Sequence, residues 1–336
     1  MGLGAVFSRS GWKAKICLAG MLANGALIAP DVMARSAPVP TLFHENWIDG
    51  TRVSEPEAQV QSLDHDTYVI RQSVKTNFEA PFLYLIFGRD KALLVDTGAE
   101  GGNIRPVIDR LVANWLTAHH RDNIPLVVAH SHSHGDHIAG DSAFRDRPNT
   151  VVVGLKPMDV ASFFGIKNWP DEVGQFDLGG RALSIIPTPG HQIAHIMIYD
   201  PRLKILLSGD VLYPGRLYVP VNHMAEERAS IDRVAAFAAT HPIRALLGAH
   251  IEMTRIPGHD YPQAVAEHPN EHHLELSVES IRELQIGLRA ALDIPERSQV
   301  HDHFIIYPVP SRISALSSKL ELLLPPARSA APLHRT

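Results

Sequence analysis

Four histidines and one aspartate lie within eight residues, directly after a short apolar run. The run, residues 126–129, reads Leu-Val-Val-Ala and predicts a buried strand. Residues 132–137 then read His-Ser-His-Gly-Asp-His, and neutral imidazoles and carboxylates are the usual ligands of zinc and similar divalent metals. The alternation directs His132 and His134 to one side, and Asp136 and His137 to another. We therefore expect this one segment to supply ligands to two neighbouring metal ions.

Three further ligand candidates follow strand-like runs later in the chain. A histidine-rich surface loop that binds metal only adventitiously would not need such partners. Their position after apolar runs favours a built metal site, at the edge where several strands end. The three are His191 after residues 182–186, Asp210 after residues 205–207, and His250 after residues 245–247.

This ordered set of motifs resembles the metallo-β-lactamase superfamily, from about residue 68 to residue 250, and its glyoxalase II and lactonase branch in particular. The resemblance implies an α/β fold in which two mixed sheets pack with helices outside, a four-layer αβ/βα sandwich, here followed by a C-terminal helical extension. It implies two divalent metal ions, with zinc expected and iron or manganese also accepted by these ligands. It also implies that Asp96 is a structural residue beneath the metals, bonded to backbone. By the same resemblance the first metal is held by His132, His134 and His191, the second by Asp136, His137 and His250, and Asp210 bridges the two.

The chemistry that the resemblance implies is hydrolysis. Two adjacent cations acidify a water between them, so that hydroxide is available near neutral pH to attack a carbonyl or phosphoryl centre. Asp136 would orient that water or take its proton. No side-chain nucleophile is needed, which agrees with a single cysteine, Cys17, far from the motifs. We expect a dinuclear zinc hydrolase that cleaves a small lactone, ester, thioester or amide.

The ligand set and the predicted C-terminal helix distinguish between alternative functions. β-Lactamases with two zincs usually carry serine or cysteine where Asp210 stands. β-Lactamase activity is therefore less favoured but is not excluded. A mononuclear iron oxidoreductase resembling persulfide dioxygenases would not need the complete second site. Glyoxalase II binds glutathione through basic residues near its C-terminal helices, and the acidic helix predicted here is no obvious platform for it. The glutamates assigned to that helix are Glu271, Glu275, Glu279 and Glu283.

Several polar residues near the motifs have two readings. Tyr213 stands three residues after Asp210, as in superfamily lactonases, where a tyrosine donates a hydrogen bond to the ester; it could equally be a wedge in its loop. Arg216 could bind a substrate carboxylate, although a solvated position is favoured, and the role of Tyr218 is open. The remaining histidines are expected to be structural or unconnected with substrate: His130, His195, His223 and His259.

The first 34 residues are typical of a signal peptide. Arg9, Lys13 and Lys15 precede the apolar residues 16–29, and small or aliphatic residues follow at 32–34. An uncleaved anchor is the alternative. We expect export to the periplasm or medium, with no membrane contact after cleavage. The remaining chain has 28 Lys+Arg against 35 Asp+Glu, a net charge of −7, which favours a small-molecule partner over nucleic acid. The oligomeric state is not predicted.

The expected domains are the signal segment 1–34, a hydrolase domain 35–295, and an extension with a tail, 296–336. Residues 211–223 are expected to form a shaped loop beside the metals. Trp169 and Phe176, in a loop over 168–176, either line the mouth of a site or cover core. Predicted strands also include residues 68–70, 82–87, 92–95, 151–153 and an edge strand 304–307. Predicted helices span residues 104–115, 138–144, 157–164, 231–239 and 274–292.

Overall fold

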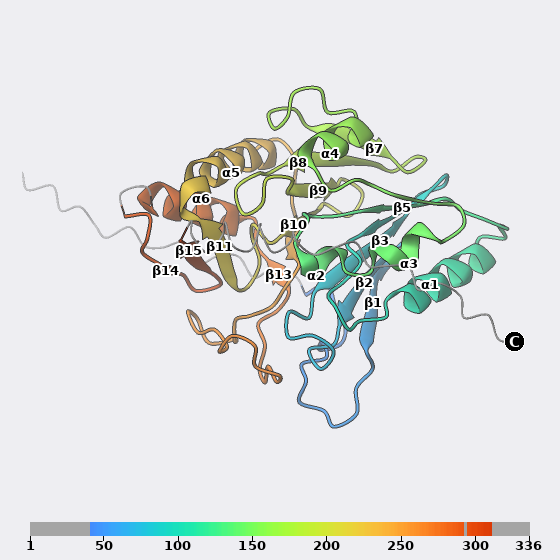
Figure 1. Ribbon diagram of the computed structural model, residues 1–336, viewed down its shortest axis with the longest axis horizontal. Coiled ribbons are helices and arrows are strands. Elements are labelled where there is room, and N and C mark those ends of the chain that lie inside the picture. The colour runs from blue at the N-terminus through green and yellow to red at the C-terminus, as the bar shows by residue number, and fades with distance from the viewer. Residues whose placement is uncertain (1–40, 292–293, 311–336) are drawn as a thin grey trace, which may run out of the picture. The chain divides into compact units, whose positions relative to one another are not determined.

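The computed structural model describes residues 41–310 except 292 and 293 (Figure 1). The predicted signal peptide and most of the predicted extension and tail, 296–336, lie outside these residues. None of the helices within the described part of the chain is long and apolar enough to cross a membrane. The domain boundaries stay a prediction.

The first sheet has six strands in chain order, β1-β2-β3-β4-β5-β6. Strands β1 to β4 are antiparallel, whereas β5 and β6 continue in parallel. Every residue of β3, β4 and β5 is buried, as expected for strands that are covered on both faces. The bounds are β1 Ala58–Asp64, β2 Thr67–Gln72, β3 Phe82–Phe87, β4 Ala92–Val95, β5 Leu126–Ala129 and β6 Thr150–Val152.

The second sheet has the order β13-β12-β10-β9-β8-β7. Strands β10 and β12 pair in parallel and the other pairs are antiparallel. A third, small sheet has the order β11-β15-β14. The bounds are β7 Gly174–Asp177, β8 Ala182–Pro187, β9 Ile196–Asp200, β10 Ile205–Gly209, β11 Arg216–Pro220, β12 Ala245–Gly248, β13 Glu275–Leu276, β14 Gln299–Val300 and β15 Ile305–Val309.

The layers follow from the three apolar clusters. Side chains of both large sheets, such as Tyr84 and Leu207, meet in one core between them. Helix α1 (Arg105–Ala118) and the short α3 (Asp141–Arg145) cover the outer face of the first sheet. Helices α5 (Met224–Ala238) and α6 (Glu279–Ala291) cover the outer face of the second (Figure 1). The predicted four-layer αβ/βα sandwich is confirmed.

Most predicted elements are present, and helix α4 has the predicted bounds, Pro157–Phe164. Strand β1 was not predicted, because its sequence Ala-Gln-Val-Gln-Ser-Leu-Asp is polar and only half-buried at the sheet edge. Phe176 lies on β7, and both Phe176 and Trp169 pack against the core between the sheets. Of their two readings, the structure supports the one in which they cover core.

The single helix predicted over 138–144 is wrong. Helix α2 (Gly135–Ile138) begins inside the ligand motif, and α3 follows it after a break at Gly140. A Cβ at Gly140 would lie 2.4 Å from the main-chain oxygen of Thr97. The chain therefore turns where it presses against the end of β4. Similarly, α5 begins at Met224, seven residues before the predicted start.

Three predictions near the third sheet are corrected. The predicted loop 211–223 contains β11 and a 3-10 turn, Val221–His223. The predicted edge strand 304–307 is β15, which lies between β11 and β14 and is therefore central. The predicted helix 274–292 begins only at Glu279, because residues 275–276 form β13 and pair with β12. All three errors arise from pairing between segments far apart in the chain.

Candidate metal centre

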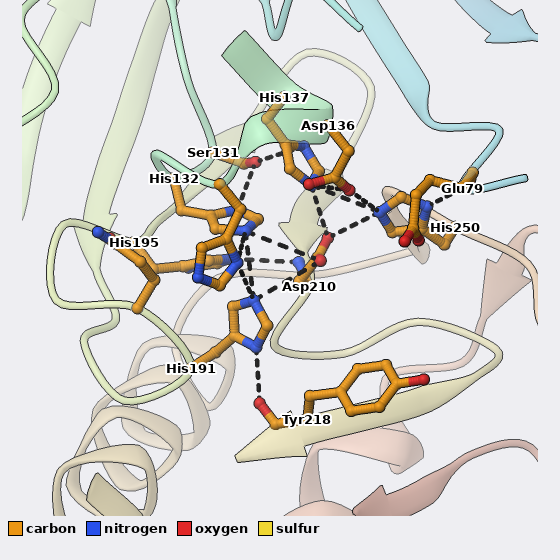
Figure 2. A network of polar contacts seen from close by, with 12 residues as sticks. Glu79, Ser131, His132, Asp136, His137, His191, His195, Asp210, Tyr218 and His250 are labelled. Carbon is orange, nitrogen blue, oxygen red and sulfur yellow. Dashed lines mark hydrogen bonds and ion pairs between the residues drawn. The ribbon is translucent and has the colours of Figure 1, made fainter. Parts of the chain in front are cut away.

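The ligand candidates from both large sheets meet at one edge of the sandwich (Figure 2). Four come from the turn after β5 and from α2, whereas His191, Asp210 and His250 each follow the end of β8, β10 or β12. Apart from Ala182 at the start of β8, every residue of these four strands is buried. The seven predicted ligands are thus held on the ends of rigid elements.

Three histidines form the first group: His132, His134 and His191. Nε2 of His132 lies 2.9 Å from Nδ1 of His134, and Nε2 of His191 lies 3.2 Å and 3.0 Å from these two atoms. The Oδ2 atom of Asp210 is 3.8 Å from Nε2 of His132 and 3.7 Å from Nε2 of His191.

The second group contains Asp136, His137, Asp210 and His250. Nε2 of His137 and Nε2 of His250 lie 3.4 Å apart. Asp136 Oδ2 is 3.1 Å from the first and 3.2 Å from the second. The Oδ1 atom of Asp210 is 3.4 Å from each. Asp210 therefore directs one oxygen to each group, as a bridging ligand requires.

These atoms fit two metal ions. Zinc–nitrogen bonds of about 2.0–2.1 Å in a tetrahedron place neighbouring ligand atoms roughly 3.3 Å apart, close to the separations within each group. Asp210 Oδ1 is buried, and no described residue hydrogen-bonds to it. Such an atom is costly unless a cation satisfies it. Nitrogen and carboxylate oxygen together suit zinc, iron, manganese or cobalt.

The ring nitrogens that face away from the site are held by hydrogen bonds. His137 Nδ1 donates to Asp96 Oδ2 at 2.9 Å, and His250 Nδ1 donates to the main-chain oxygen of Glu79 at 2.7 Å. His191 Nδ1 donates to the main-chain oxygen of Tyr218 at 2.6 Å (Figure 2). Such contacts fix the ring orientation and leave the other nitrogen free to bind metal.

Asp96 contacts no ligand atom and lies beneath the site, as predicted. It accepts hydrogen bonds from the Ser131 main-chain N–H at 2.7 Å and from the Ser131 hydroxyl at 2.9 Å. That hydroxyl lies 3.1 Å from Nδ1 of His132. One carboxylate therefore orients His137 directly and His132 through Ser131. Its contact with a ligand ring goes beyond the predicted bonding to backbone.

Burial lowers the pKa of the histidines in both groups, whereas neighbouring carboxylates raise it. The balance between the two effects differs between the groups. Burial lowers the pKa of His132 and His191, and lowers that of His134 to about 3, so the first group consists of neutral rings with free lone pairs. In the second group burial also lowers the pKa of His137 and His250. The carboxylates of Asp136 and Asp210 nevertheless raise both well above the usual range. A metal ion there would displace protons that these carboxylates otherwise attract.

Sequence reasoning missed Glu227, a buried residue of α5. Its Oε2 atom accepts a hydrogen bond from the main-chain N–H of His191 at 2.7 Å, and burial raises its pKa to about 8. A Cβ at Gly190 would lie 2.0 Å from this oxygen. Helix α5 thus fixes the turn that carries His191. No local pattern in the sequence could indicate it, since the two residues come from distant segments.

Tyr213 is buried beside the second group, and its ring packs edge-on against His250 with centroids 5.5 Å apart. Its hydroxyl donates to the main-chain oxygen of Arg216 and lies 3.0 Å from Oε2 of Glu252. The hydroxyl therefore holds its own loop together.

The expectation that Arg216 is solvated is wrong, because Arg216 is buried and ion-paired with Glu252 and Asp260.

Two of the other histidines behave as expected. His130 Nε2 lies 2.8 Å from Asp141 Oδ1, and fully buried His195 contacts the Thr188 hydroxyl at 2.7 Å. His223 and His259 belong to neither ligand group, and their expected separation from the substrate stays a prediction. Two of the glutamates assigned to the acidic helix are not on it. Glu271 forms a buried ion pair with Arg71, and Glu275 lies in β13.

Comparison with known proteins places this architecture in a family. Residues 77–239 match the model of the metallo-β-lactamase superfamily. Similar curated proteins include the hydroxyacylglutathione hydrolase of Rhizobium meliloti (strain 1021), 29% identical over 118 residues, 34% of this chain and 43% of that protein. The same-named protein of Ruegeria pomeroyi is 31% identical over 153 residues, 41% of this chain and 51% of its own length. The chain thus spans about half the length of the curated relatives it matches.

Among solved structures, the metallo-β-lactamase from Pontibacter korlensis is similar at 19% identity, covering 57% of this chain and 91% of that chain with a TM-score of 0.42. Residues 77–239, just under half of the chain, thus carry the match to the metallo-β-lactamase superfamily. The predicted resemblance to this superfamily is therefore confirmed, and hydrolase activity stays a proposal.

Proposed function

We propose that the protein is an exported hydrolase that holds two divalent metal ions, zinc by preference, and cleaves a small lactone, ester, thioester or amide. The observation that carries the proposal is the pair of ligand groups that share Asp210. When bound there, two metal ions would supply an acidified water and polarise a substrate carbonyl.

The chain's own residues have separate tasks in this proposal. Asp210 joins the groups, and Asp96 and the main-chain oxygens of Glu79 and Tyr218 hold the ligand rings in place. Asp136 has the more exposed side chain of the two ligand carboxylates, 19% against 9% for Asp210. It is therefore the carboxylate best placed to orient water or accept its proton. Tyr213 would act on substrate indirectly, because its hydroxyl is already bonded to Arg216 and Glu252.

A carbonyl substrate has further support from the curated relatives, which are named for hydrolysis of an acylated glutathione, a thioester. The complete second group gives no support to a one-metal oxidoreductase. An aspartate at position 210 likewise argues against a β-lactamase.

The test combines metal analysis of the purified protein with a hydrolysis screen of lactones, esters, thioesters, β-lactams and phosphodiesters. We expect two zinc ions per chain and turnover of one carbonyl class. His250→Ala should abolish turnover and lower metal content, whereas His259→Ala, at an exposed histidine outside both groups, should change neither. One iron per chain, no hydrolysis, and oxygen uptake with a persulfide would overturn the proposal.

Export is a separate part of the proposal and is supported by the basic and apolar pattern of residues 1–34. Expression of the full chain in a Gram-negative host should yield a periplasmic protein that begins near residue 35. A cytoplasmic protein with an intact N-terminus would contradict it.

A further inference from the structure

A small cavity of about 50 Å³ lies beside the metal centre. Its walls include Glu79 before β3, Arg216 and Tyr218 on β11, and Glu252 after His250. The main-chain oxygens of Glu79 and Tyr218 are the atoms that hold the rings of His250 and His191. A substrate whose carbonyl is at the metals would therefore extend the neighbouring part of its acyl group along this wall.

Arg216 has little capacity left for a substrate anion. Its guanidinium donates to Glu252 Oε1 at 2.9 Å, to Asp260 Oδ2 at 2.7 Å and to the main-chain oxygen of Tyr261 at 2.7 Å. Its Nε donates to the Tyr218 hydroxyl at 2.8 Å. A guanidinium offers five N–H donors, and four are already in use. Two carboxylates also neutralise its charge, so it acts as a brace between β11 and the segment after β12.

Glu79 is in the opposite situation. Its carboxylate lines the cavity, and no hydrogen bond from the described residues reaches it, although its own main chain holds His250 (Figure 2). Among the described lining residues, Arg216 is the only lysine or arginine. The charged side chains that line the cavity or pair with Arg216 are three carboxylates, Glu79, Glu252 and Asp260, and one guanidinium. The wall is therefore net negative.

We propose that Glu79 determines specificity, by receiving a cationic or N–H-bearing group that the substrate carries near its scissile carbonyl. The inference rests on the proposed hydrolase and narrows its substrate to amino-bearing acyl compounds. A substrate carboxylate in the same place would meet an unpaired carboxylate and a saturated arginine, and such like-charge contact is disfavoured. Anionic acyl groups are thus disfavoured.

Three hydroxamates that differ only in their terminal group test this without turnover. They are 3-aminopropanohydroxamate, butanohydroxamate and succinic monohydroxamate, which end in ammonium, methyl and carboxylate. Each binds through its hydroxamate at the metals and presents its end to the wall. Calorimetry on the zinc-loaded protein at pH 8 and low salt should give the tightest Kd for the ammonium compound and the weakest for the carboxylate. We expect the weakest and the tightest Kd to differ by at least tenfold, and added salt should reduce this span of Kd values.

Glu79→Gln keeps the shape of the side chain and removes its charge. It should shrink the span to about threefold or less, and leave zinc content and the Kd of butanohydroxamate unchanged. A change in all three affinities would indicate a structural role instead. The matched control is Glu267→Gln, an exposed glutamate close in sequence to the cavity-lining residue His268, and it should keep the full span.

The ethyl thioesters of the same three acids distinguish a failure of this inference from a failure of the proposed hydrolase function. Turnover of all three at similar rates, with no effect of Glu79→Gln on either rates or affinities, would refute the role of Glu79 and leave the hydrolase intact. A protein that holds no metal, binds no hydroxamate and cleaves no ester would overturn the proposed hydrolase and this inference with it.

Discussion

Asp210 is the residue on which both metal groups depend, because its two oxygens face different sets of histidines. Asp210→Asn keeps the size of the side chain but removes the charge that offsets repulsion between two cations. We expect zinc content to fall from two ions per chain towards one, and turnover to fall by a factor of about 100 or more. Metal analysis after dialysis, with steady-state kinetics, measures both.

His259→Gln serves as the matched control for this variant, since His259 is an exposed histidine outside both ligand groups. It should retain two ions and full turnover. If Asp210→Asn also kept two tightly held ions, Asp210 would not be a bridging ligand.

Tyr213 illustrates how a correct spacing can support a different role. Its hydroxyl, expected from the resemblance to reach an ester, is bonded within the loop. Tyr213→Phe leaves the Arg216 carbonyl without this donor, and we expect the free energy of unfolding to fall by about 1–2 kcal/mol. Chemical denaturation measures this. Lost turnover of lactones with unchanged stability would instead restore direct contact between the hydroxyl and substrate.

At the scale of elements, the turn after β8 depends on helix α5. Gly190 has φ +154°, and a Cβ there would lie 2.0 Å from Oε2 of Glu227 and 2.6 Å from its Cα. Gly190→Ala should therefore push the turn away from α5, lower the free energy of unfolding by about 3 kcal/mol, and weaken metal binding through His191. Denaturation and zinc titration follow the two effects.

Gly165→Ala is the matched control for the effect of the backbone alone. Gly165 also has a positive φ, +70°, but no atom lies within 4 Å of the Cβ position. We expect a loss of about 1 kcal/mol and unchanged zinc affinity. Equal losses in the two variants would show that contact with α5 contributes nothing.

The segment before β13 also contacts the turn between β14 and β15, where His272 Nε2 lies 3.0 Å from His303 Nδ1. Burial lowers the pKa of His272 to about 4, whereas an unfolded histidine titrates near about 6.5. Below about pH 6.5 the unfolded chain binds the proton first, so the free energy of unfolding falls as the pH drops towards 4.

Replacing His272 should reduce this decrease in the free energy of unfolding at acid pH. His272→Gln is expected to reduce the slope of stability against pH between 6.5 and 4, measured by denaturation at several pH values. His259→Gln, at an exposed histidine, should leave the slope of the wild type. An unchanged slope in His272→Gln would mean that His272 is already protonated in the folded protein.

The sequence predicted elements well where their own side chains determine them. Strands β3, β4 and β5 are continuous apolar runs, and α4 has proline at its start and glycine directly after its end. It failed where a distant partner decides the structure. Residues 216–220 are a strand because β15 pairs with them, and residues 275–276 leave the helix because β12 does. Neither partner can be read from local periodicity.

The candidate site divides in the same way. The seven candidate ligands stand in dense motifs with characteristic spacing, so the sequence could indicate them, and the structure brings them together in two groups. Their binding of metal stays a prediction. Glu227 and the carboxylate-rich wall around Arg216 are assembled from separate helices, strands and loops by tertiary packing. The proposed substrate recognition therefore depends on the folded molecule, whereas the candidate metal ligands are already indicated by the chain.

For the molecule as a whole, the metal site joins the two sheets. The turn after β5 and helix α2 supply ligands from the first sheet, and the ends of β8, β10 and β12 supply them from the second. Without metal, three neutral rings face one another with nitrogens 2.9–3.2 Å apart. Each ion, when bound, would therefore stabilise the contact between the sheets as well as supply chemistry.

Removal of metal with a chelator should accordingly lower the unfolding temperature, and added zinc should restore it. An ion present at 1,000 times its Kd stabilises the folded state by about 4 kcal/mol, so two sites give a shift easily seen by calorimetry. The shift should be smaller in Asp210→Asn, because one shared ligand is impaired, and unchanged in His259→Gln. An unfolding temperature independent of zinc in the wild type would mean that the two ligand groups close equally well without metal, and that the sheets alone hold the site in place.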